Sequence, residues 1–284
     1  MPTILQKAVA FEALHQQDKT FVLPNPWDVG SAKMLAALGY KALATTSAGY
    51  AFSAGKGLAI GDISREEALS HAADIVNATN LPVSADLENG YGDAPEVVAE
   101  TIRMAADIGL CGCTIEDTTG DPDNPLYDRD FAIERIAAAV EAARSLDRPF
   151  MVTARAENYL FGREDLEDTL LRLKGYEAVG ADVLYAPGLP DLDAIRTVCS
   201  SVSKPVNVVS GIGLPGVTVL ELEGAGVRRI SAGSALARVA FGAMIEASKD
   251  ILETGSFSSF KSAASFGSIA KLIKVADTAS KSDS

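Results

Sequence analysis

Eight short apolar runs, each followed by an amphipathic stretch, constrain the fold of this 284-residue chain most strongly. Short apolar, β-branched runs predict strands, and apolar residues that recur every three to four positions predict helices. The predicted strands are 21–24, 42–47, 83–88, 112–117, 150–157, 183–186, 206–210 and 229–232. The predicted helices are 28–38, 64–78, 93–109, 129–147, 163–179, 191–201, 215–225 and 234–253. Eight strand–helix units predict a (β/α)₈ TIM barrel, an α/β fold.

The residues at the helix ends favour this barrel over the alternative, an open doubly wound sheet. Ser64 and Glu67 form the pattern of a capping box. Asp93 is placed as a cap residue close to Pro95, where the next helix is predicted to begin. Similar phrases that contain a glycine close three of the predicted helices, at 37–40, 107–110 and 178–181. Such repetition is typical of repeated strand–helix units.

Two helical extensions flank the predicted barrel. Residues 4–17 are expected to form a helix that closes its lower end, and residues 234–274 a C-terminal helical extension. No linker divides the chain, so we expect residues 1–284 to form a single barrel domain.

The composition indicates a soluble, cytoplasmic protein that acts on small molecules. A net charge of −13 argues against nucleic acid or a membrane surface as partner, because both attract clustered Lys and Arg. Neither a signal peptide nor an apolar stretch long enough to span a membrane is found. The cysteines Cys111, Cys113 and Cys199 lack the spacing of a disulfide framework, which favours a reducing compartment.

Two neighbouring predicted strands end in acidic residues, at the barrel face where TIM-barrel enzymes have their active sites. Residues two apart in a strand face the same side, so Asp86 and Glu88 are expected to face one space, with Glu116 at the end of the next strand. Carboxylates that face one point repel unless a cation lies between them, and Mg²⁺ prefers oxygen ligands. We expect these three residues to coordinate or water-bridge one Mg²⁺, with Mn²⁺ as an alternative ion. The other interpretation is that they cap helices or pair with lysines.

Other polar residues at the strand ends are candidates for binding substrate. Arg155 is expected to neutralise the carboxylates and also to hold an anionic substrate group through a forked contact. Ser47, Ala48 and Gly49 form a small-residue turn whose backbone N–H groups could bind a carboxylate or an oxyanion. Tyr50 follows the same strand and is a candidate acid or base, although most tyrosines at such places only pack.

The remaining polar candidates are an asparagine and the two histidines. Asn207 lies on the seventh predicted strand and is expected to bind substrate. His15 and His71 fall on predicted helices away from the strand ends. We therefore expect histidine neither to bind the metal nor to transfer protons.

With the motifs 86–92, 115–117 and 153–157, the chain resembles the isocitrate lyase/phosphoenolpyruvate mutase superfamily from about residue 24 to residue 233. The resemblance implies a Mg²⁺-dependent barrel enzyme that acts on small 2-oxo or 2-hydroxy acids through an enolpyruvate-like state. It implies that Asp86 is the main metal ligand and that Arg155 holds the carboxylate and enolate oxygens of the substrate. It also places Asp62 on a mobile loop near the reacting group, although an acid before a helix is favourable in any case.

The chain departs from the superfamily in two loops that decide the reaction. Isocitrate and methylisocitrate lyases carry a Lys-Lys-Cys-Gly-His loop after the fourth strand, whereas residues 118–127 here contain no lysine, cysteine or histidine. The phosphonate enzymes carry a lysine in this loop and a histidine after the sixth strand, but residues 185–188 here lack that histidine. Both differences disfavour those activities.

The residues that the resemblance assigns to stabilising an enolate are present in this sequence, whereas the thiol acid and the phosphoryl-binding residues are absent. We expect a carbon–carbon lyase that decarboxylates an oxaloacetate-like acid or cleaves a substituted malate. The alternatives are phosphoenolpyruvate mutase or phosphonopyruvate hydrolase chemistry, and a non-catalytic protein that binds 2-oxo acids. In the superfamily the last barrel helix is often exchanged between subunits, which implies a homo-oligomer, either a dimer or a tetramer. The apolar run 235–245 is consistent with that exchange and equally with packing on its own barrel.

Overall fold

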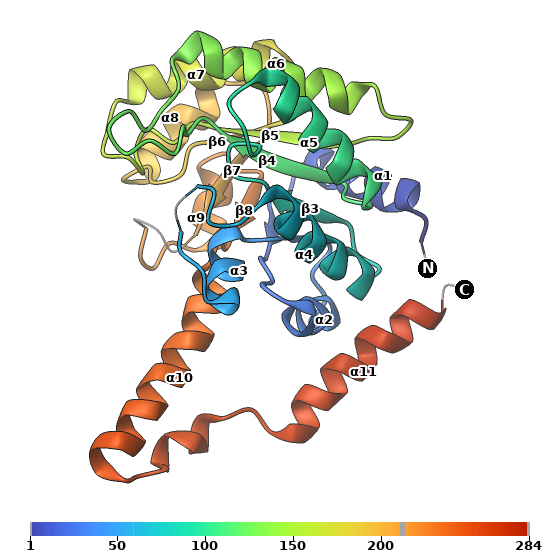
Figure 1. The fold of residues 1–284 in the computed structure, drawn as a ribbon, viewed down its shortest axis with the longest axis vertical. Helices are drawn as coiled ribbons and strands as arrows, with labels where there is room; N and C mark the ends of the chain where they lie inside the picture. Colours follow the sequence, from blue (N-terminus) through green and yellow to red (C-terminus); the bar gives the residue numbers. More distant parts are fainter. Residues whose placement is uncertain (1, 59, 211–213, 283–284) are drawn as a thin grey trace.

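The computed structural model of the protein describes residues 2–58, 60–210 and 214–282, and it forms the parallel eight-stranded barrel that the sequence predicts (Figure 1). The strands are β1 (Phe21–Leu23), β2 (Leu43–Ala44), β3 (Val83–Asp86), β4 (Gly112–Glu116), β5 (Met151–Arg155), β6 (Val183–Tyr185), β7 (Val206–Val209) and β8 (Arg229–Ser231). Neighbouring strands pair in the order β1-β8-β7-β6-β5-β4-β3-β2, all parallel.

The first and second strands close the barrel through a few individual hydrogen bonds. The N–H of Ala44 on β2 donates to the Pro24 carbonyl just after β1 (3.1 Å). The side chain of Asn25 then joins three strand ends, because its Nδ2 donates to the Thr45 carbonyl (2.9 Å) and its Oδ1 accepts from the Ala232 N–H (2.9 Å). This buried asparagine therefore fixes the rim of the barrel where β8, β1 and β2 end.

The predicted alternation of strands and helices is confirmed. The helices that follow the strands are α2 (Val29–Ala37), α4 (Arg65–Ala78), α5 (Pro95–Asp107), α6 (Arg129–Arg144), α7 (Leu166–Ala178), α8 (Leu192–Ser201), α9 (Val219–Gly224) and α10 (Ala235–Thr254). The capping box of Ser64 and Glu67 begins α4 as predicted. The predicted cap of α5 is wrong, because its N-cap is Ala94 and the Asp93 carboxylate accepts a hydrogen bond from the Tyr127 hydroxyl instead (2.5 Å).

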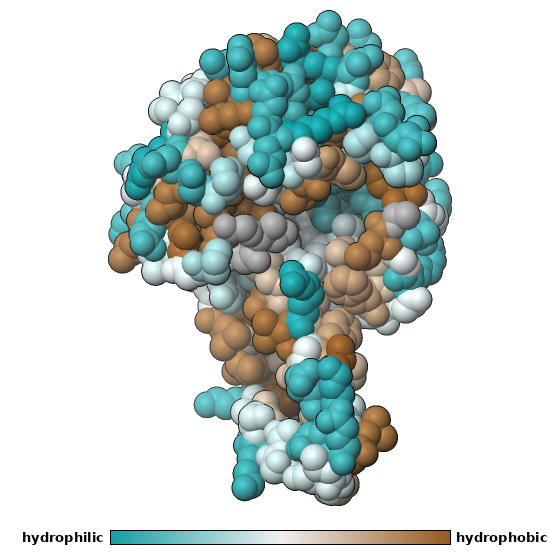
Figure 2. All heavy atoms as spheres, turned by 90° about the vertical axis from the view of Figure 1, so that its left-hand side faces the viewer, coloured by the Kyte–Doolittle hydropathy of each residue, from teal (hydrophilic) through white to brown (hydrophobic). Residues whose placement is uncertain are grey.

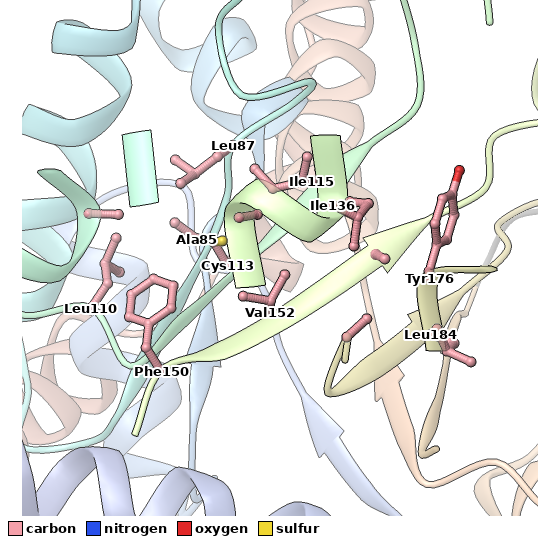
Figure 3. Packing of buried hydrophobic residues seen from close by; sticks show 14 of the residues in the cluster. Ala85, Leu87, Leu110, Cys113, Ile115, Ile136, Phe150, Val152, Tyr176 and Leu184 are labelled. Carbon is pink, nitrogen blue, oxygen red and sulfur yellow. The ribbon is translucent and has the colours of Figure 1, made fainter. Parts of the chain in front are cut away.

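Alternation along β3, β4 and β5 separates the hydrophobic core from the barrel interior. Ala85, Cys113, Ile115 and Val152 are almost fully buried in the core shared with the surrounding helices (Figure 3). Their neighbours along the same strands face the inside of the barrel, because side chains alternate along a strand. At the far end of β4, Gly112 lies so close to β5 that an added Cβ would be 2.5 Å from the Met151 carbonyl oxygen.

Helix α1 (Ile4–Gln16) closes the lower end of the barrel, as predicted. Its Ala8 and Phe11 side chains are fully buried. His15 is also buried, and its Nδ1–H donates to the Phe11 carbonyl (2.8 Å), which leaves Nε2 as an acceptor toward Arg229 Nη1 (3.3 Å). Burial and the nearby Arg229 charge lower the pKa of His15 to about 3.

A C-terminal arm, residues 235–282, leaves the barrel along α10 and returns through a 3₁₀ helix, η1 (Ser258–Ser262), and α11 (Phe266–Ser282) (Figure 1). α11 continues beyond residue 274, where the predicted extension ended. In α10 only Ala237 is buried, and hydrophobic side chains gather on the narrow stem of the arm (Figure 2). α11 packs against α2, where Lys33 pairs with Asp277 (2.7 Å). Within the described chain, no helix has the length and apolar character needed to cross a membrane.

Candidate active site

A cavity of about 180 Å³ opens at the carboxyl ends of the strands and extends into the barrel. Each strand contributes to its wall, through Leu23, Ala44, Asp86, Glu116, Arg155, Tyr185, Asn207 and Ser231 in chain order. TIM-barrel interiors are usually filled by bulky branched side chains. Here small polar residues such as Ser84 and Thr114 take their place, which leaves room for a ligand of a few heavy atoms.

Arg155 lines this wall near the rim and contacts three carboxylates. Its Nη1 is 3.0 Å from Asp86 Oδ1, its Nη2 is 3.0 Å from Glu116 Oε2, and its Nε is 2.7 Å from Glu157 Oε1. β4 and β5 are in register, so Glu116 and Arg155 are direct neighbours. Burial lowers the pKa of Arg155, but the three carboxylates outweigh burial and raise it well above its ordinary value. The guanidinium is therefore a fixed positive charge at the rim of the cavity.

Asp86 is held by donors from two neighbouring elements. The backbone N–H and the hydroxyl of Ser47 both donate to its Oδ2 (3.1 and 2.7 Å), and the Thr114 hydroxyl donates to its Oδ1 (3.2 Å). Ser47 begins a short helix, α3 (Ser47–Ala54), that the sequence did not predict. The predicted small-residue turn is thus the first turn of a helix, and the Gly49 N–H already donates to the Thr46 hydroxyl (3.2 Å).

Glu88, a predicted metal ligand, is near enough to feel the charges of Asp86 and Glu116 but is not among the residues that line the cavity. β3 ends at Asp86, and Glu88 lies in a turn with a φ of 48°, so strand alternation does not place its side chain. Burial, followed by the charges of Asp86 and Glu116, raises the pKa of Glu88 to about 8. The Oε2 atom of Glu88 is buried and has no hydrogen-bond partner among the described residues. The hydroxyl of Tyr91, three residues later, is also buried without such a partner.

The acidic cluster fits a hard divalent cation only in part. Within the described ranges, no three His, Cys, Asp or Glu side chains already converge as direct metal ligands. Arg155 binds Asp86 and Glu116 and so draws these carboxylates toward itself. The buried Glu88 Oε2 without a partner nevertheless marks a place where a cation or its water would be stabilised. Because Mg²⁺ often uses one or two carboxylates and keeps several waters, Asp86 with water-bridged Glu88 and Glu116 is a donor set that suits it.

A second arginine, which the sequence analysis missed, lies at the floor of the cavity. Arg229 is 1% exposed, and its Nε donates to Asn207 Oδ1 (2.8 Å) while its Nη2 donates to the Thr153 hydroxyl (2.9 Å). Because Asn207 Oδ1 accepts from Arg229, its Nδ2 is fixed as a donor, and it donates to the Ser231 hydroxyl (3.1 Å). The predicted substrate-binding residue Asn207 therefore lines the cavity in one defined orientation.

Two of the predicted catalytic residues lie outside the cavity wall. Tyr50 stacks on His71 with 4.0 Å between the ring centroids. Asp62 is exposed, in the segment between α3 and α4, and its Oδ2 lies against Gly57, where an added Cβ would be 2.2 Å away. The cysteines 111 and 113 are buried in the barrel wall, and burial raises the pKa of both thiols, as expected for unreactive residues.

Comparisons with known proteins agree with this geometry. The family model of phosphoenolpyruvate phosphomutase matches residues 11–252. The crystal structure of a candidate lyase/mutase from Burkholderia cenocepacia J2315 is 52% identical, with a TM-score of 0.91, and the match covers 94% of this chain and 95% of that chain. An oxaloacetate decarboxylase from Marinomonas sp. (strain MWYL1) is 29% identical over 70% of this chain and 69% of the relative. The structure of a 2,3-dimethylmalate lyase is 26% identical, with a TM-score of 0.83, and the match covers 100% of this chain and 98% of that chain.

Fold, site and relatives together place the chain among the TIM-barrel lyases and mutases. It belongs to the phosphoenolpyruvate phosphomutase family, within the isocitrate lyase/phosphoenolpyruvate mutase superfamily that the sequence motifs resemble. The relatives also include 2-methylisocitrate lyases. The family contains several reactions, so membership leaves the particular reaction to be argued from the site.

Proposed function

We propose that the protein is a Mg²⁺-dependent carbon–carbon lyase that acts on a small 2-oxo or 2-hydroxy dicarboxylic acid through an enolpyruvate-type intermediate. Decarboxylation of oxaloacetate and cleavage of a substituted malate are the two reactions that fit. The observation that carries the proposal is Arg155, which lines the cavity and is held in place by three carboxylates. An oxaloacetate decarboxylase and a 2,3-dimethylmalate lyase among the relatives support the same two reactions.

The chemistry needs positive charge that is fixed before the reaction begins. Breaking a carbon–carbon bond next to a ketone leaves an enolate, and preorganised positive groups lower that barrier. Asp86, Glu116 and Glu157 bind three different nitrogens of Arg155 and so prevent its side chain from rotating. Arg155 would hold the carboxylate and the developing enolate oxygen of the substrate. Mg²⁺ bound by Asp86, with Glu88 and Glu116 acting through water, would polarise the same oxygen, and Mn²⁺ is an alternative ion.

The loop after β4 argues against the other reactions of the family. Residues 118–127 close on themselves, because the Thr119 N–H donates to the Pro125 carbonyl (2.9 Å) and the Thr119 hydroxyl to the Asn124 carbonyl (2.6 Å). This loop carries no cysteine that could act as an acid and no lysine that could bind a phosphoryl group. Carbon–carbon cleavage without a thiol acid is the chemistry that the remaining residues support.

The test is pyruvate release from oxaloacetate, substituted malates and phosphonopyruvate, with Mg²⁺ and with a chelator. We expect metal-dependent release from a carbon–carbon substrate and its loss in Arg155→Ala. Arg144→Ala is the matched control, because Arg144 is an arginine that binds the Gly180 carbonyl and Asp182 far from the cavity. Release only from phosphonopyruvate would overturn the reaction proposed. Thermal stabilisation by 2-oxo acids without any turnover would favour the non-catalytic binding protein.

We also propose that the C-terminal arm contacts a second subunit, in line with the exchange of the last barrel helix that the superfamily resemblance implies. Val239 and Leu252 on α10 are 70% and 86% exposed, and Phe266 at the start of α11 is 96% exposed. Single exposed apolar side chains are common, but a contiguous apolar patch marks an interaction surface, and hydrophobic side chains gather on the stem of this arm (Figure 2). A dimer or tetramer is therefore the assembly that we expect, and the cytoplasmic location stays a prediction from the sequence.

A further inference from the structure

The segment 87–93, between β3 and α5, has an unusual backbone. Glu88, Gly90 and Tyr91 have φ values of 48°, 86° and 62°. Glycine adopts this left-handed region freely, but it costs free energy for glutamate and tyrosine. Such a conformation persists only where the surrounding structure determines it strongly.

The carbonyl oxygens of this segment are held by donors from three directions. The Leu87 carbonyl accepts from the Gly90 N–H (2.8 Å) within the turn, and the Glu88 carbonyl accepts from the Glu116 N–H (2.9 Å) of β4. The Gly90 carbonyl accepts from the Thr101 hydroxyl (2.9 Å) of α5. The remaining carbonyls of the segment that have a described partner are those of Asn89, Gly92 and Asp93.

One side chain from α6, Arg135, binds these three carbonyls. Its Nη2 donates to Asn89, and its Nη1 donates to Gly92 (2.6 Å) and to Asp93. Arg135 is 1% exposed, and among the described residues no carboxylate lies within ion-pair distance of it. Its guanidinium lies over the Tyr127 ring, 4.3 Å from the centroid. The charge is thus surrounded by an aromatic face and by backbone carbonyls.

A guanidinium suits this place because its donors lie in one plane with fixed directions, so that one side chain can hold carbonyls that are several residues apart. One carbonyl, that of Asn89, lies within the left-handed turn, and the other two, of Gly92 and Asp93, follow it directly, so Arg135 ties the turn to the residues that leave it. A lysine would keep the charge but not this geometry.

We propose that Arg135 is a positioning residue of the active site, which holds the segment 87–93 in the conformation that buries the Glu88 carboxylate on the side of the acid cluster. The inference rests on the proposed function for the part that Glu88 plays in metal binding. It deepens that proposal, because it names a residue outside the cavity on which the acid cluster depends.

The test compares Arg135→Lys and Arg135→Met with Arg144→Lys and Arg144→Met. Arg144 is a matched control, because it lies on the same helix and also donates to a carbonyl, that of Gly180 at the opposite end of the barrel (3.1 Å). The first readout is hydrogen exchange of the Gly90 and Tyr91 amides without metal, since these amides bond within the turn (2.8 and 3.1 Å). The second readout is the affinity for Mg²⁺ from calorimetric titration.

We expect both Arg135 variants to exchange these two amides at least about tenfold faster, with exchange in β4 and β5 unchanged, and to bind Mg²⁺ about 10- to 100-fold more weakly. The Arg144 variants should change neither quantity. Unchanged exchange at Gly90 and Tyr91, or equal acceleration throughout the barrel, would overturn the inference. If the wild-type protein binds no Mg²⁺ while the Arg135 variants still loosen only this turn, the positioning role stands and the proposed metal chemistry fails.

Discussion

His15 makes the stability of this barrel depend on pH in a way that can be calculated. The pKa of its imidazole is lowered from 6.5 to about 3 by burial and by the charge of Arg229. Protonation would place a second positive charge beside that arginine and remove the acceptor, Nε2, that Arg229 Nη1 contacts. The folded protein therefore keeps His15 neutral at pH values where the unfolded chain protonates it.

The sign and size follow from linkage. Because the folded pKa is the lower one, the contribution of His15 is fully present above pH 6.5 and is lost as the pH falls toward 3. Each pKa unit corresponds to about 1.4 kcal/mol, so the complete loss is about 5 kcal/mol. At pH 5, which is about 1.5 units below the unfolded pKa, the loss is already about 2 kcal/mol.

Urea unfolding at pH 7.5 and pH 5.0 measures this loss, with His15→Gln as the comparison. Glutamine does not titrate, and the other histidine, His71, is present in both proteins. The free energy of unfolding of the wild-type protein should fall by about 2 kcal/mol more than that of the variant between the two pH values. Parallel losses in the two proteins would refute the conclusion that His15 is buried in its neutral form.

Two further predictions concern Arg155 and the C-terminal arm. Arg155→Lys keeps the positive charge but loses the contacts of three guanidinium nitrogens with three carboxylates. We expect kcat/KM for pyruvate release to fall about 100- to 1000-fold. An activity equal to that of the wild-type protein would contradict the role given to the guanidinium. Val239→Asp introduces a charge on the exposed stem of the arm. If the stem contacts a second subunit as proposed, light scattering should show a lower mass for the variant than for the wild-type protein, and an equal mass would contradict that contact.

The periodicity of the sequence was sufficient to predict the barrel, because each strand–helix unit repeats its own local pattern. The acid cluster was predictable for a related reason: parallel strands bring their carboxyl ends to one rim, which places Asp86, Glu116 and Arg155 together. The helix α3 was missed, because its small residues give no apolar stripe. The strands predicted to end at Glu88 and Glu157 end two residues earlier, since sequence shows where residues favour a strand but not where pairing stops.

Long-range contacts of single side chains could not be predicted from the sequence. Arg135 and Arg229 bind partners more than 20 residues away, and an arginine in an amphipathic stretch or strand is ordinarily read as exposed. Left-handed backbone at Glu88 and Tyr91 is equally hidden, because only the nearby glycines signal a turn. Tyr50 was proposed as catalytic because it follows a strand end, and Asp62 because of the family resemblance; the structure does not bring either residue to the cavity wall.

Gly112 lies at the closed end of the barrel, on the pair of strands that carries Glu116 and Arg155 at the open end. β4 and β5 pair over five consecutive residues, from Gly112 with Met151 to Glu116 with Arg155. A methyl group at Gly112 would meet the Met151 carbonyl, and two stiff paired strands would carry the displacement along their length to the ion pair. A position with no chemical group of its own is therefore expected to influence the geometry of the Glu116–Arg155 pair at the other end of the strands.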